Sequence, residues 1–313
     1  MQTKKKSEML LRWVCFAVLL TAVLFRLAAE LDWHALTSGL HNTEKETLAI
    51  AAEPPTEGYP TMPYTVPGFT PDTTLTAEDA ALVSVQNTSW SSFDAAELIE
   101  QPIPLTLDVD GPVILIVHTH ASEAYAGSTH TENTEENVVC VGAALADRLN
   151  NNGIYTLHDT TLNDLLGYND AYERTAEVIS RYLAEYPSIQ MVIDVHRDAI
   201  SDNDGNELAL TAELGGEPAA KLLFVMGTDT EALPYPAWQG NLSVALQLQA
   251  YCEKYAPGLF RELALRAARY NQHLTPCSLL LEVGAAGNSL EEAVRSAEFF
   301  ADRLSELLLA QEK

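Results

Sequence analysis

Histidine and acidic side chains follow three apolar runs of the sequence. His118, His120 and Glu123 come directly after PVILIV, His196 follows MVIDV, and Glu282 lies within SLLLEV. Residues two apart in an extended segment project to the same side, so His118 and His120 are expected to converge. Two imidazoles and a carboxylate are typical ligands of a hydrolytic zinc site, which keeps one position for water. The metal acidifies that water, and a further carboxylate can accept its proton.

Each of these residues also has a plainer interpretation. A single histidine at the end of a strand is usually a surface or capping residue, and this holds for His196 taken alone. Glu282 follows three leucines, where an unpaired carboxylate is unfavourable to bury. An ion pair with Arg266 or Arg269 is therefore the alternative to a catalytic role. The HxH pair favours the metal, because two protonated imidazoles on one side would repel each other.

The elements that must position these side chains alternate between strands and helices. Apolar runs predict buried strands at residues 112–117, 154–158, 191–195, 221–226 and 278–283. Helical spacing predicts helices at residues 137–149, 171–186, 238–255, 259–270 and 290–309. This alternation predicts one α/β domain with a largely parallel sheet. Ligands of such sheets bind beyond the carboxyl ends of the strands, where the histidines and acids lie.

Two segments precede this domain, which we place at residues 105–313. Residues 1–30 contain the uncharged run Trp13–Phe25 after three lysines, which predicts a cytoplasmic tip and a transmembrane anchor. A signal peptide removed after export is the alternative. Residues 31–104 are acidic and rich in Pro and Thr, and 51–104 hold eight of the 15 prolines, which predicts an extended linker.

The charge balance excludes one class of function. The 313 residues include 18 Lys and Arg against 44 Asp and Glu, a formal net charge of −26. Affinity for nucleic acid depends on clustered cations, so binding to DNA or RNA is not expected. An apolar content of 47% is enough for a sizeable core.

Seven stretches of the sequence carry a resemblance to a known family. They are ILIVHTHASEAY (114–125), NVVCVGAAL (137–145), HDTT (158–161), YPSIQMVIDVHRDAI (186–200), MGTD (226–229), LALRAARYNQHL (263–274) and SLLLEVGAAGNSLEEA (278–293). In this order they resemble the stage II sporulation protein P family, membrane-anchored cell-wall hydrolases of endospore-forming bacteria. The resemblance covers about residues 105–310, and seven matching stretches are more specific than HxHxxE alone.

The resemblance implies a fold and a metal site. The family is similar to zinc-dependent N-acetylmuramoyl-L-alanine amidases, which have a mixed, mostly parallel sheet flanked by helices. Those enzymes have a His/Glu/His zinc site and a second, catalytic glutamate. Carried onto this sequence, the expected zinc ligands are His120, Glu123 and His196, and the expected proton-transfer residue is Glu282.

Two of these ligand positions stay open between neighbouring residues. His118 is the alternative to His120, which we prefer because it stands closer to Glu123 in the sequence. Amidases of this type place the glutamate ligand well downstream, at the start of a helix. Glu135 or Glu136 is therefore the alternative to Glu123.

The resemblance also implies a substrate. The expected reaction is hydrolysis of the peptidoglycan amide between N-acetylmuramic acid and L-Ala, and endopeptidase cleavage of stem-peptide crosslinks is an associated activity of the family. Arg197 is expected to help hold the charge of the tetrahedral oxygen. Arg266 and Arg269 share a face of the helix predicted at 259–270 and are candidates to bind stem-peptide carboxylates. A plain solvated surface is the alternative for that face.

Partners and location follow from the same resemblance. The expected partners are the lytic transglycosylase stage II sporulation protein D and the membrane scaffold stage II sporulation protein M, which act together during engulfment of the forespore. The expected location is the cell membrane, with a single pass and an extracytoplasmic catalytic domain. Two other functions remain open, because loops build the substrate pocket. They are a non-catalytic, membrane-tethered module that binds wall peptides, and a zinc peptidase of other specificity.

Overall fold

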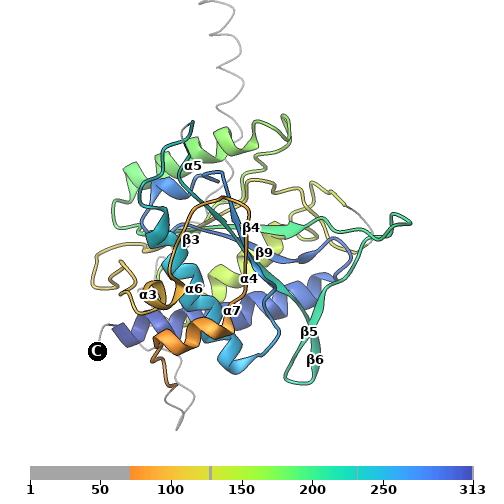
Figure 1. Cartoon of the computed structure of the whole chain (residues 1–313). Helices are drawn as coiled ribbons and strands as arrows, with labels where there is room; N and C mark the ends of the chain where they lie inside the picture. The colour runs from red at the N-terminus through yellow and green to blue at the C-terminus, as the bar shows by residue number, and fades with distance from the viewer. Residues whose placement is uncertain (1–70, 127–128, 231, 312–313) are drawn as a thin grey trace, which may run out of the picture. The chain divides into compact units, whose positions relative to one another are not determined.

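A seven-stranded sheet forms the centre of the fold (Figure 1). The computed structural model describes residues 71–126, 129–230 and 232–311. The strands of the sheet follow the order β1-β8-β7-β9-β4-β2-β3. Their bounds are Val85–Asn87 (β1), Ile114–Val117 (β2), Thr156–His158 (β3), Met191–Asp198 (β4), Leu222–Gly227 (β7), Leu263–Arg266 (β8) and Leu279–Ala285 (β9). Neighbouring strands are parallel except β7 and β9, so the sheet is mixed and mostly parallel.

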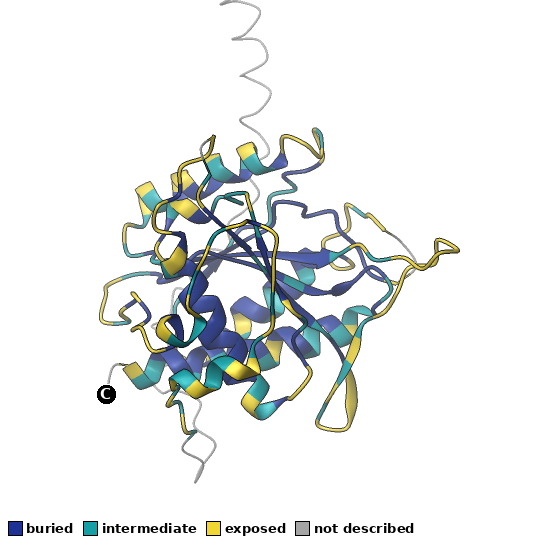
Figure 2. Cartoon of the chain, in the orientation of Figure 1, coloured by how far each residue is buried: buried dark blue, intermediate teal, exposed yellow. Residues whose placement is uncertain are grey.

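Helices cover this sheet on both faces. They are α3 (Ala95–Ile99), α4 (Val138–Asn151), α5 (Ala171–Glu185), α6 (Trp238–Tyr255) and α7 (Leu290–Gln311), with the short 3₁₀ turns η2 (Ala77–Leu82) and η3 (Gln272–Leu274). The larger hydrophobic cluster joins α4, α6 and α7 to one face, and a smaller cluster joins α5 to the other. Figure 2 shows the strands and the inner sides of the helices buried. The predicted α/β sheet flanked by helices is confirmed.

The alternation of side chains along β2 divides the core between the two faces. Ile114 and Ile116 join the larger cluster, whereas Leu115 and Val117 face α5. All four residues are buried, which is why the run is continuously apolar in the sequence.

Helix α4 lies close to the strands that carry the site. The side chain of Asn137 caps its start by accepting a hydrogen bond of 3.0 Å from Val139 N, as the sequence predicts. Gly142, in the middle of the helix, faces the imidazole ring of His118. A Cβ atom at Gly142 would lie 2.5 Å from that ring, so only glycine permits this approach.

The helix predicted for residues 259–270 is wrong. Leu263–Arg266 form β8, which pairs in parallel with β1 and β7. Leu263 and Leu265 are buried in the larger cluster, so packing between two strands overrides the helical propensity of this Leu-, Ala- and Arg-rich run. Arg266 and Arg269 therefore do not share the face of a helix.

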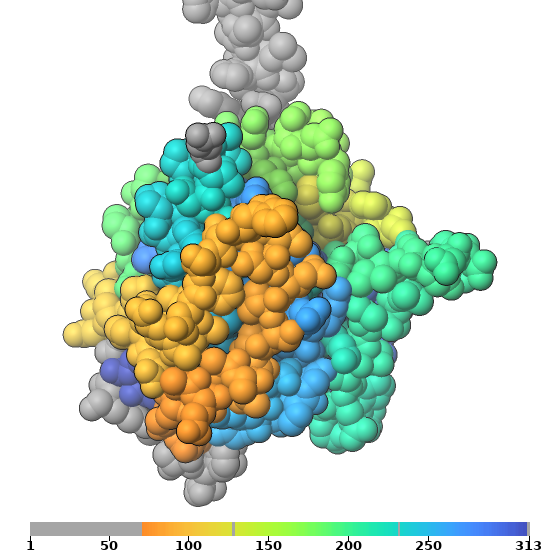
Figure 3. All heavy atoms as spheres, in the orientation of Figure 1, coloured from red at the N-terminus to blue at the C-terminus, as the bar shows by residue number. Residues whose placement is uncertain are grey.

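Residues 71–104 differ from the predicted linker. β1 pairs with β8 at the edge of the sheet, and α3 buries Leu98 and Ile99. The hydroxyl of Ser243 on α6 donates a hydrogen bond of 2.6 Å to Leu98 O. Figure 3 shows this N-terminal segment, in orange, spread over the surface of the domain. Residues 71–104 contain three prolines, and their scattered apolar residues dock on the core, so the folded domain begins before residue 105.

A two-stranded hairpin joins β4 to β7 and was not predicted. β5 (Thr211–Leu214) and β6 (Glu217–Ala220) pair antiparallel, apart from the main sheet (Figure 1). Gly215 and Gly216 form the turn with φ of +63° and +88°, a conformation that a two-residue hairpin turn requires.

The predicted anchor at residues 1–30 and the first part of the predicted linker, 31–70, lie outside the described residues. Within the described part of the chain, none of the helices combines the length and the apolar character that a membrane span needs.

Candidate active site

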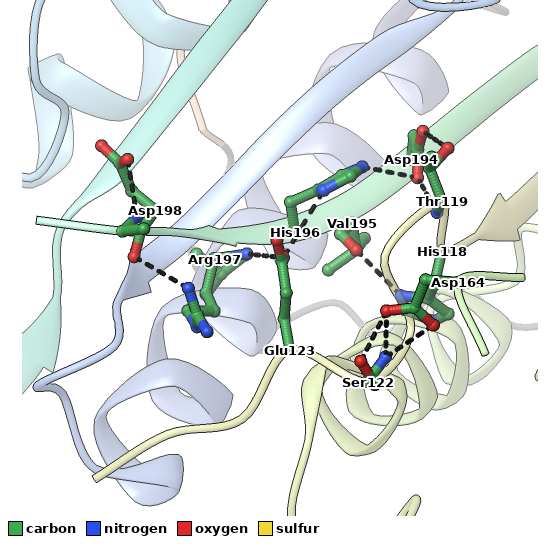
Figure 4. Close-up of polar contacts among 12 residues, drawn as sticks. His118, Thr119, Ser122, Glu123, Asp164, Asp194, Val195, His196, Arg197 and Asp198 are labelled. Atoms are coloured by element: carbon green, nitrogen blue, oxygen red, sulfur yellow. Dashed lines mark hydrogen bonds and ion pairs between the residues drawn. The ribbon is translucent and has the colours of Figure 1, made fainter. Parts of the chain in front are cut away.

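Three neighbouring strands bring the predicted histidines and acids together. His120 follows β2, His196 lies on β4 and Glu282 lies on β9. β2 and β9 flank β4, and Glu282 stands directly across from His196 in the strand register. Glu123 comes from the turn after β2, and its carboxylate lies beside the His196 ring (Figure 4). We call His120, Glu123, His196 and Glu282 the strand-edge cluster.

His196 lies between two carboxylates. Its Nδ1 is 3.5 Å from Glu123 Oε2. Its Nε2 is 3.0 Å from Asp194 Oδ1, which is close enough for an ion pair, but the two atoms are not aligned for a hydrogen bond. Thr119 fixes Asp194 by donating its backbone N–H (2.8 Å) and its hydroxyl (2.6 Å) to the two carboxylate oxygens (Figure 4). Burial alone would lower the pKa of His196, but the two carboxylates raise this pKa well above its ordinary value.

Glu123 is buried and held by the backbone of β4. Its Oε2 accepts a hydrogen bond of 3.0 Å from the N–H of Arg197. Burial opposes ionisation, but His196 and the Arg197 N–H outweigh it and lower the pKa of Glu123 below its ordinary value. The site therefore holds Glu123 as a carboxylate next to the His196 ring.

His120 packs among aromatic rings. Its ring stacks on Tyr168 with centroids 3.8 Å apart and planes 3° from parallel, and Tyr172 and His196 meet it edge-on. Burial lowers the pKa of His120, which favours the neutral imidazole. Its Nδ1 is buried without a hydrogen-bond partner. A neutral imidazole with an unpaired nitrogen is a potential metal ligand.

Glu282 has one carboxylate oxygen, Oε2, that is buried without a hydrogen-bond partner. Burial raises the pKa of Glu282 to about 8, and the Glu123 and Asp198 carboxylates contribute to the rise. A carboxyl group with a pKa close to neutral suits proton transfer. Among the described residues Glu282 forms no ion pair, so the arginine partner considered as an alternative is not found.

His118 faces away from the strand-edge cluster, so the predicted convergence of His118 with His120 is wrong. Its Nδ1 lies 2.9 Å from Val195 O, and its Nε2 lies 2.8 Å from His158 Nε2. Burial lowers the pKa of His118 to about 4, which keeps this internal pair neutral. The reason is that β2 ends at Val117, so the strand alternation that predicted convergence stops before the first histidine.

The three glutamates considered as ligands lie in different surroundings. Glu123 is buried beside His196, whereas Glu135 and Glu136 are exposed in the turn before α4. Glu136 instead borders a separate pocket beside the start of α7. The geometry therefore favours Glu123.

Arg197 points to the opposite side of β4 from His196, because successive residues of a strand alternate. Its buried guanidinium donates hydrogen bonds to the carbonyl oxygens of Ala124 (2.9 Å) and Thr129. It thereby fixes the segment that follows Glu123. This placement gives Arg197 a positioning role, which differs from the expected contact with a tetrahedral oxygen.

An open groove extends from the strand-edge cluster across β7 and β8. The smaller hydrophobic cluster joins α5 to β2, β3 and β4, so this helix leaves the other strands uncovered on that face. The groove has a volume of about 430 Å³. Residues that line it include Gln86, Asp198, Val225, Arg261, Arg266 and Glu282. We call it the β7–β8 groove.

Two arginines, Arg261 and Arg266, line the β7–β8 groove together with the acidic residues Asp198, Glu262 and Glu282. Arg261 pairs with Asp198 at 2.5 Å, and Arg266 Nη1 donates a hydrogen bond of 3.1 Å to Gln86 O. Arg266 therefore lies on the same open surface as the candidate proton-transfer residue. Arg269 is not among the residues that line the groove.

Four residues that build this site were not predicted from the sequence. They are Asp164, Tyr168, Tyr172 and Asp194. Asp194 stands two residues before His196, so strand alternation along DVHRD could have identified it. Asp164 accepts hydrogen bonds from the backbone N–H and the hydroxyl of Ser122 and so holds the turn that carries Glu123 (Figure 4). The tyrosines belong to no recognisable motif.

The donor types of the strand-edge cluster fit zinc, which binds imidazole nitrogens and carboxylate oxygens. His120 Nδ1 and Glu282 Oε2 are buried without partners, which is typical of atoms that contact an ion or a water. However, His196 has a carboxylate at each nitrogen. Among the described residues, no group of three His, Cys, Asp or Glu side chains is arranged to hold a metal ion. Zinc ligation would therefore replace one of the carboxylate contacts of His196.

Comparison with known proteins identifies the family. Stage II sporulation protein P of Bacillus subtilis (strain 168) is 31% identical over 222 residues, which are 65% of this chain and 53% of that protein. The chain thus spans about half the length of this curated relative. Solved structures that are similar include the N-acetylmuramoyl-L-alanine amidase AmiC2 of Nostoc punctiforme (14% identity, TM-score 0.39, 66% of this chain and 100% of that one). An N-acetylmuramoyl-L-alanine amidase from Clostridium difficile 630 is similar too (12% identity, TM-score 0.38, 65% and 98%). The family model of stage II sporulation protein P (SpoIIP) matches residues 60–305, and the chain therefore belongs to this family.

Proposed function

We propose that the chain is a peptidoglycan hydrolase that acts in sporulation and cleaves the amide between N-acetylmuramic acid and L-Ala. One observation carries this proposal. The strand-edge cluster brings two imidazoles and two carboxylates together beside an open groove, in a chain that belongs to the stage II sporulation protein P family. A cluster of this composition is suited to activating water for hydrolysis.

The cofactor that we propose is zinc, held by His120, Glu123 and His196. Bound zinc supplies a Lewis acid and a water of lowered pKa. Asp194, held by Thr119, orients the His196 ring, and carboxylates in this position commonly fix the orientation of a metal-binding histidine.

Glu282 is the proposed general base. Its carboxylate accepts a proton from the attacking water and then returns it to the amine that leaves. The position across from His196 supports this role, because it places the carboxylate on the same sheet face as the imidazole. In the β7–β8 groove, the Arg266 guanidinium binds a carboxylate of the stem peptide, and charge-assisted pairing of this kind is strong.

Cleavage of stem-peptide crosslinks is the second candidate activity. The β7–β8 groove favours it, because a polar channel beside Glu282 can accept an extended peptide on its own. A non-catalytic wall-binding module is disfavoured, because the four residues of the strand-edge cluster are all present. A zinc peptidase of other specificity would differ in the bond that it cleaves.

The proposed location is the cell membrane, with a single N-terminal span and the folded domain outside the cytoplasm. The uncharged run Trp13–Phe25 after three lysines supports this proposal. The proposed partners are the lytic transglycosylase stage II sporulation protein D and the scaffold stage II sporulation protein M. Membership of the family supports them.

Mass spectrometry of peptidoglycan digested with the purified chain tests the proposed cleavage. The expected products are stem peptides with a free L-Ala amine and glycan strands with free muramic acid carboxyl groups. Products cleaved within the crosslinks alone would indicate a peptidase and contradict the amidase proposal. Undigested peptidoglycan would contradict both catalytic candidates and leave the non-catalytic module.

A further inference from the structure

The segment that follows β3 exposes an unusual concentration of apolar side chains. Leu165, Leu166 and Tyr168 are 48%, 78% and 57% exposed. Large hydrophobic side chains this exposed are scattered singly elsewhere in the described residues, but here three fall within four positions. Exposed apolar side chains that gather in one place indicate a binding surface. We call these three residues the apolar rim.

The apolar rim stands on a firmly held base. Asn163 Nδ2 donates a hydrogen bond of 3.0 Å to His118 O, and the buried Asp164 accepts two from Ser122. The guanidinium of Arg174 donates to the carbonyl oxygens of Asn163 and Gly167, on either side of the two leucines. The exposed side chains are thus presented by a fixed backbone, which lowers the entropy lost when a ligand binds.

The apolar rim is continuous with the strand-edge cluster. The ring of Tyr168 lies parallel to the ring of His120 with centroids 3.8 Å apart. Because Tyr168 remains more than half exposed, a ligand on the rim would lie next to the reacting bond.

The order of the strands sets the rim and the β7–β8 groove on opposite flanks of the cluster. Across the sheet, the groove lies on β8 and β7 at one side. Next come Glu282 on β9, His196 on β4 and His120 just after β2. The rim follows β3 at the far edge. One flank is therefore charged and the other is apolar. The amide that we propose as the scissile bond also joins two chemically different parts, a peptide with carboxylates and a sugar.

We propose that the apolar rim binds the glycan strand of the substrate, so that the strand runs past β3 while the stem peptide lies in the β7–β8 groove. This inference rests on the proposed function. The faces of N-acetylhexosamine rings expose C–H groups, and their acetyl groups end in methyls. Leucine and tyrosine side chains bury such groups favourably. The rim therefore gives the site its preference for substrates that carry a sugar over free peptides.

Binding of two separate probes tests this orientation. The probes are glycan strands stripped of stem peptides, and a free stem peptide. In the full chain, the double variant Leu165→Ser and Leu166→Ser should raise the Kd for the stripped strands about tenfold, because part of two leucine side chains loses its apolar contact. Its Kd for the free peptide should change less than about twofold. Leu82→Ser is the matched control, since Leu82 is 41% exposed on η2.

Several outcomes would overturn the inference. One is an unchanged Kd of the double variant for stripped strands, and another is an equal loss for both probes. If the double variant loses binding to phospholipid vesicles while glycan binding is unchanged, the rim contacts a lipid surface instead. Failure of the proposed function would look different, because the wild-type chain would then leave intact peptidoglycan uncut.

Discussion

His196 is held from both sides by groups that are themselves held. Thr119 donates two hydrogen bonds to Asp194, and the Arg197 N–H donates one to Glu123. The two carboxylates lie at the two nitrogens of the His196 ring. Buried charges are unfavourable without partners, so these residues depend on each other for their ionised forms.

The two candidate arginines for substrate binding differ in position, and this difference can be measured. Arg266→Met should raise the KM for peptidoglycan about tenfold, because one charge-assisted hydrogen bond is worth about 1.5–3 kcal/mol. Arg269→Met should change KM less than about twofold, because Arg269 does not line the β7–β8 groove. Steady-state kinetics with soluble peptidoglycan fragments would measure both values. Equal effects of the two variants would contradict the groove as the peptide site, provided that both variants melt like the wild type.

The residues of the strand-edge cluster were predictable from the sequence, but the side chains that contact them were only partly predictable. His196 and Glu282 were found because each lies on a long apolar run that becomes a central strand. His118 was expected beside His120, but the strand ends one residue before it, and sequence alone does not show where a strand stops. The stacking of Tyr168 on His120 depends on the path of a loop between distant residues, which leaves no periodic signal.

At the scale of elements, the position of α5 determines where the site can open. This helix packs on β2, β3 and β4, and the sheet face beyond β9 carries the β7–β8 groove. The opposite face is closed by α4, α6 and α7. The strand-edge cluster thus lies at the border between a covered and an open part of one face, where a polymer can reach its side chains.

Helix α4 offers a test of how closely the elements must pack. Gly142→Ala should lower the free energy of unfolding by about 1–3 kcal/mol, because its Cβ would overlap the buried His118 ring. Gly240→Ala is the matched control on α6, where no atom lies within 4 Å of the added Cβ. It should raise stability by up to about 1 kcal/mol through helix propensity. Urea unfolding measures both, and a stable Gly142→Ala protein would contradict the close approach of α4.

The long elements were predictable, whereas the edge of the sheet was not. α6 spans Trp238–Tyr255 as predicted, because a long run of helix-favouring residues without Pro specifies a helix by itself. β8 was taken for a helix, since its Leu, Ala and Arg residues favour helices and its strand state depends on β1. β1 in turn has three residues, too few to give a strand pattern in the sequence, so only the pairing of two distant segments makes either a strand.

At the scale of the whole molecule, the negative net charge is compatible with the proposed binding of peptidoglycan, because two arginines lie together at the proposed peptide site. The formal net charge is −26, which disfavours contact with anionic polymers through long-range attraction. Arg261 and Arg266 nevertheless lie together in the β7–β8 groove. Recognition of the substrate would therefore depend on short-range pairing, and added salt should affect it less than it affects a basic wall-binding protein.

We propose above all that Glu282 transfers the proton within a zinc site formed by His120, Glu123 and His196. The most direct test measures turnover and zinc content together in Glu282→Gln, with His196→Ala as the matched ligand variant. Glutamine keeps the shape of Glu282 but cannot accept a proton.

Turnover of Glu282→Gln should fall about 100-fold or more, as expected for lost general acid–base catalysis, while zinc stays near one per chain. His196→Ala should lose zinc and activity together. Both variants must show the wild-type circular dichroism spectrum. Undiminished turnover of Glu282→Gln would contradict the account, and loss of zinc from this variant would make Glu282 a ligand and the assignment of Glu123 wrong.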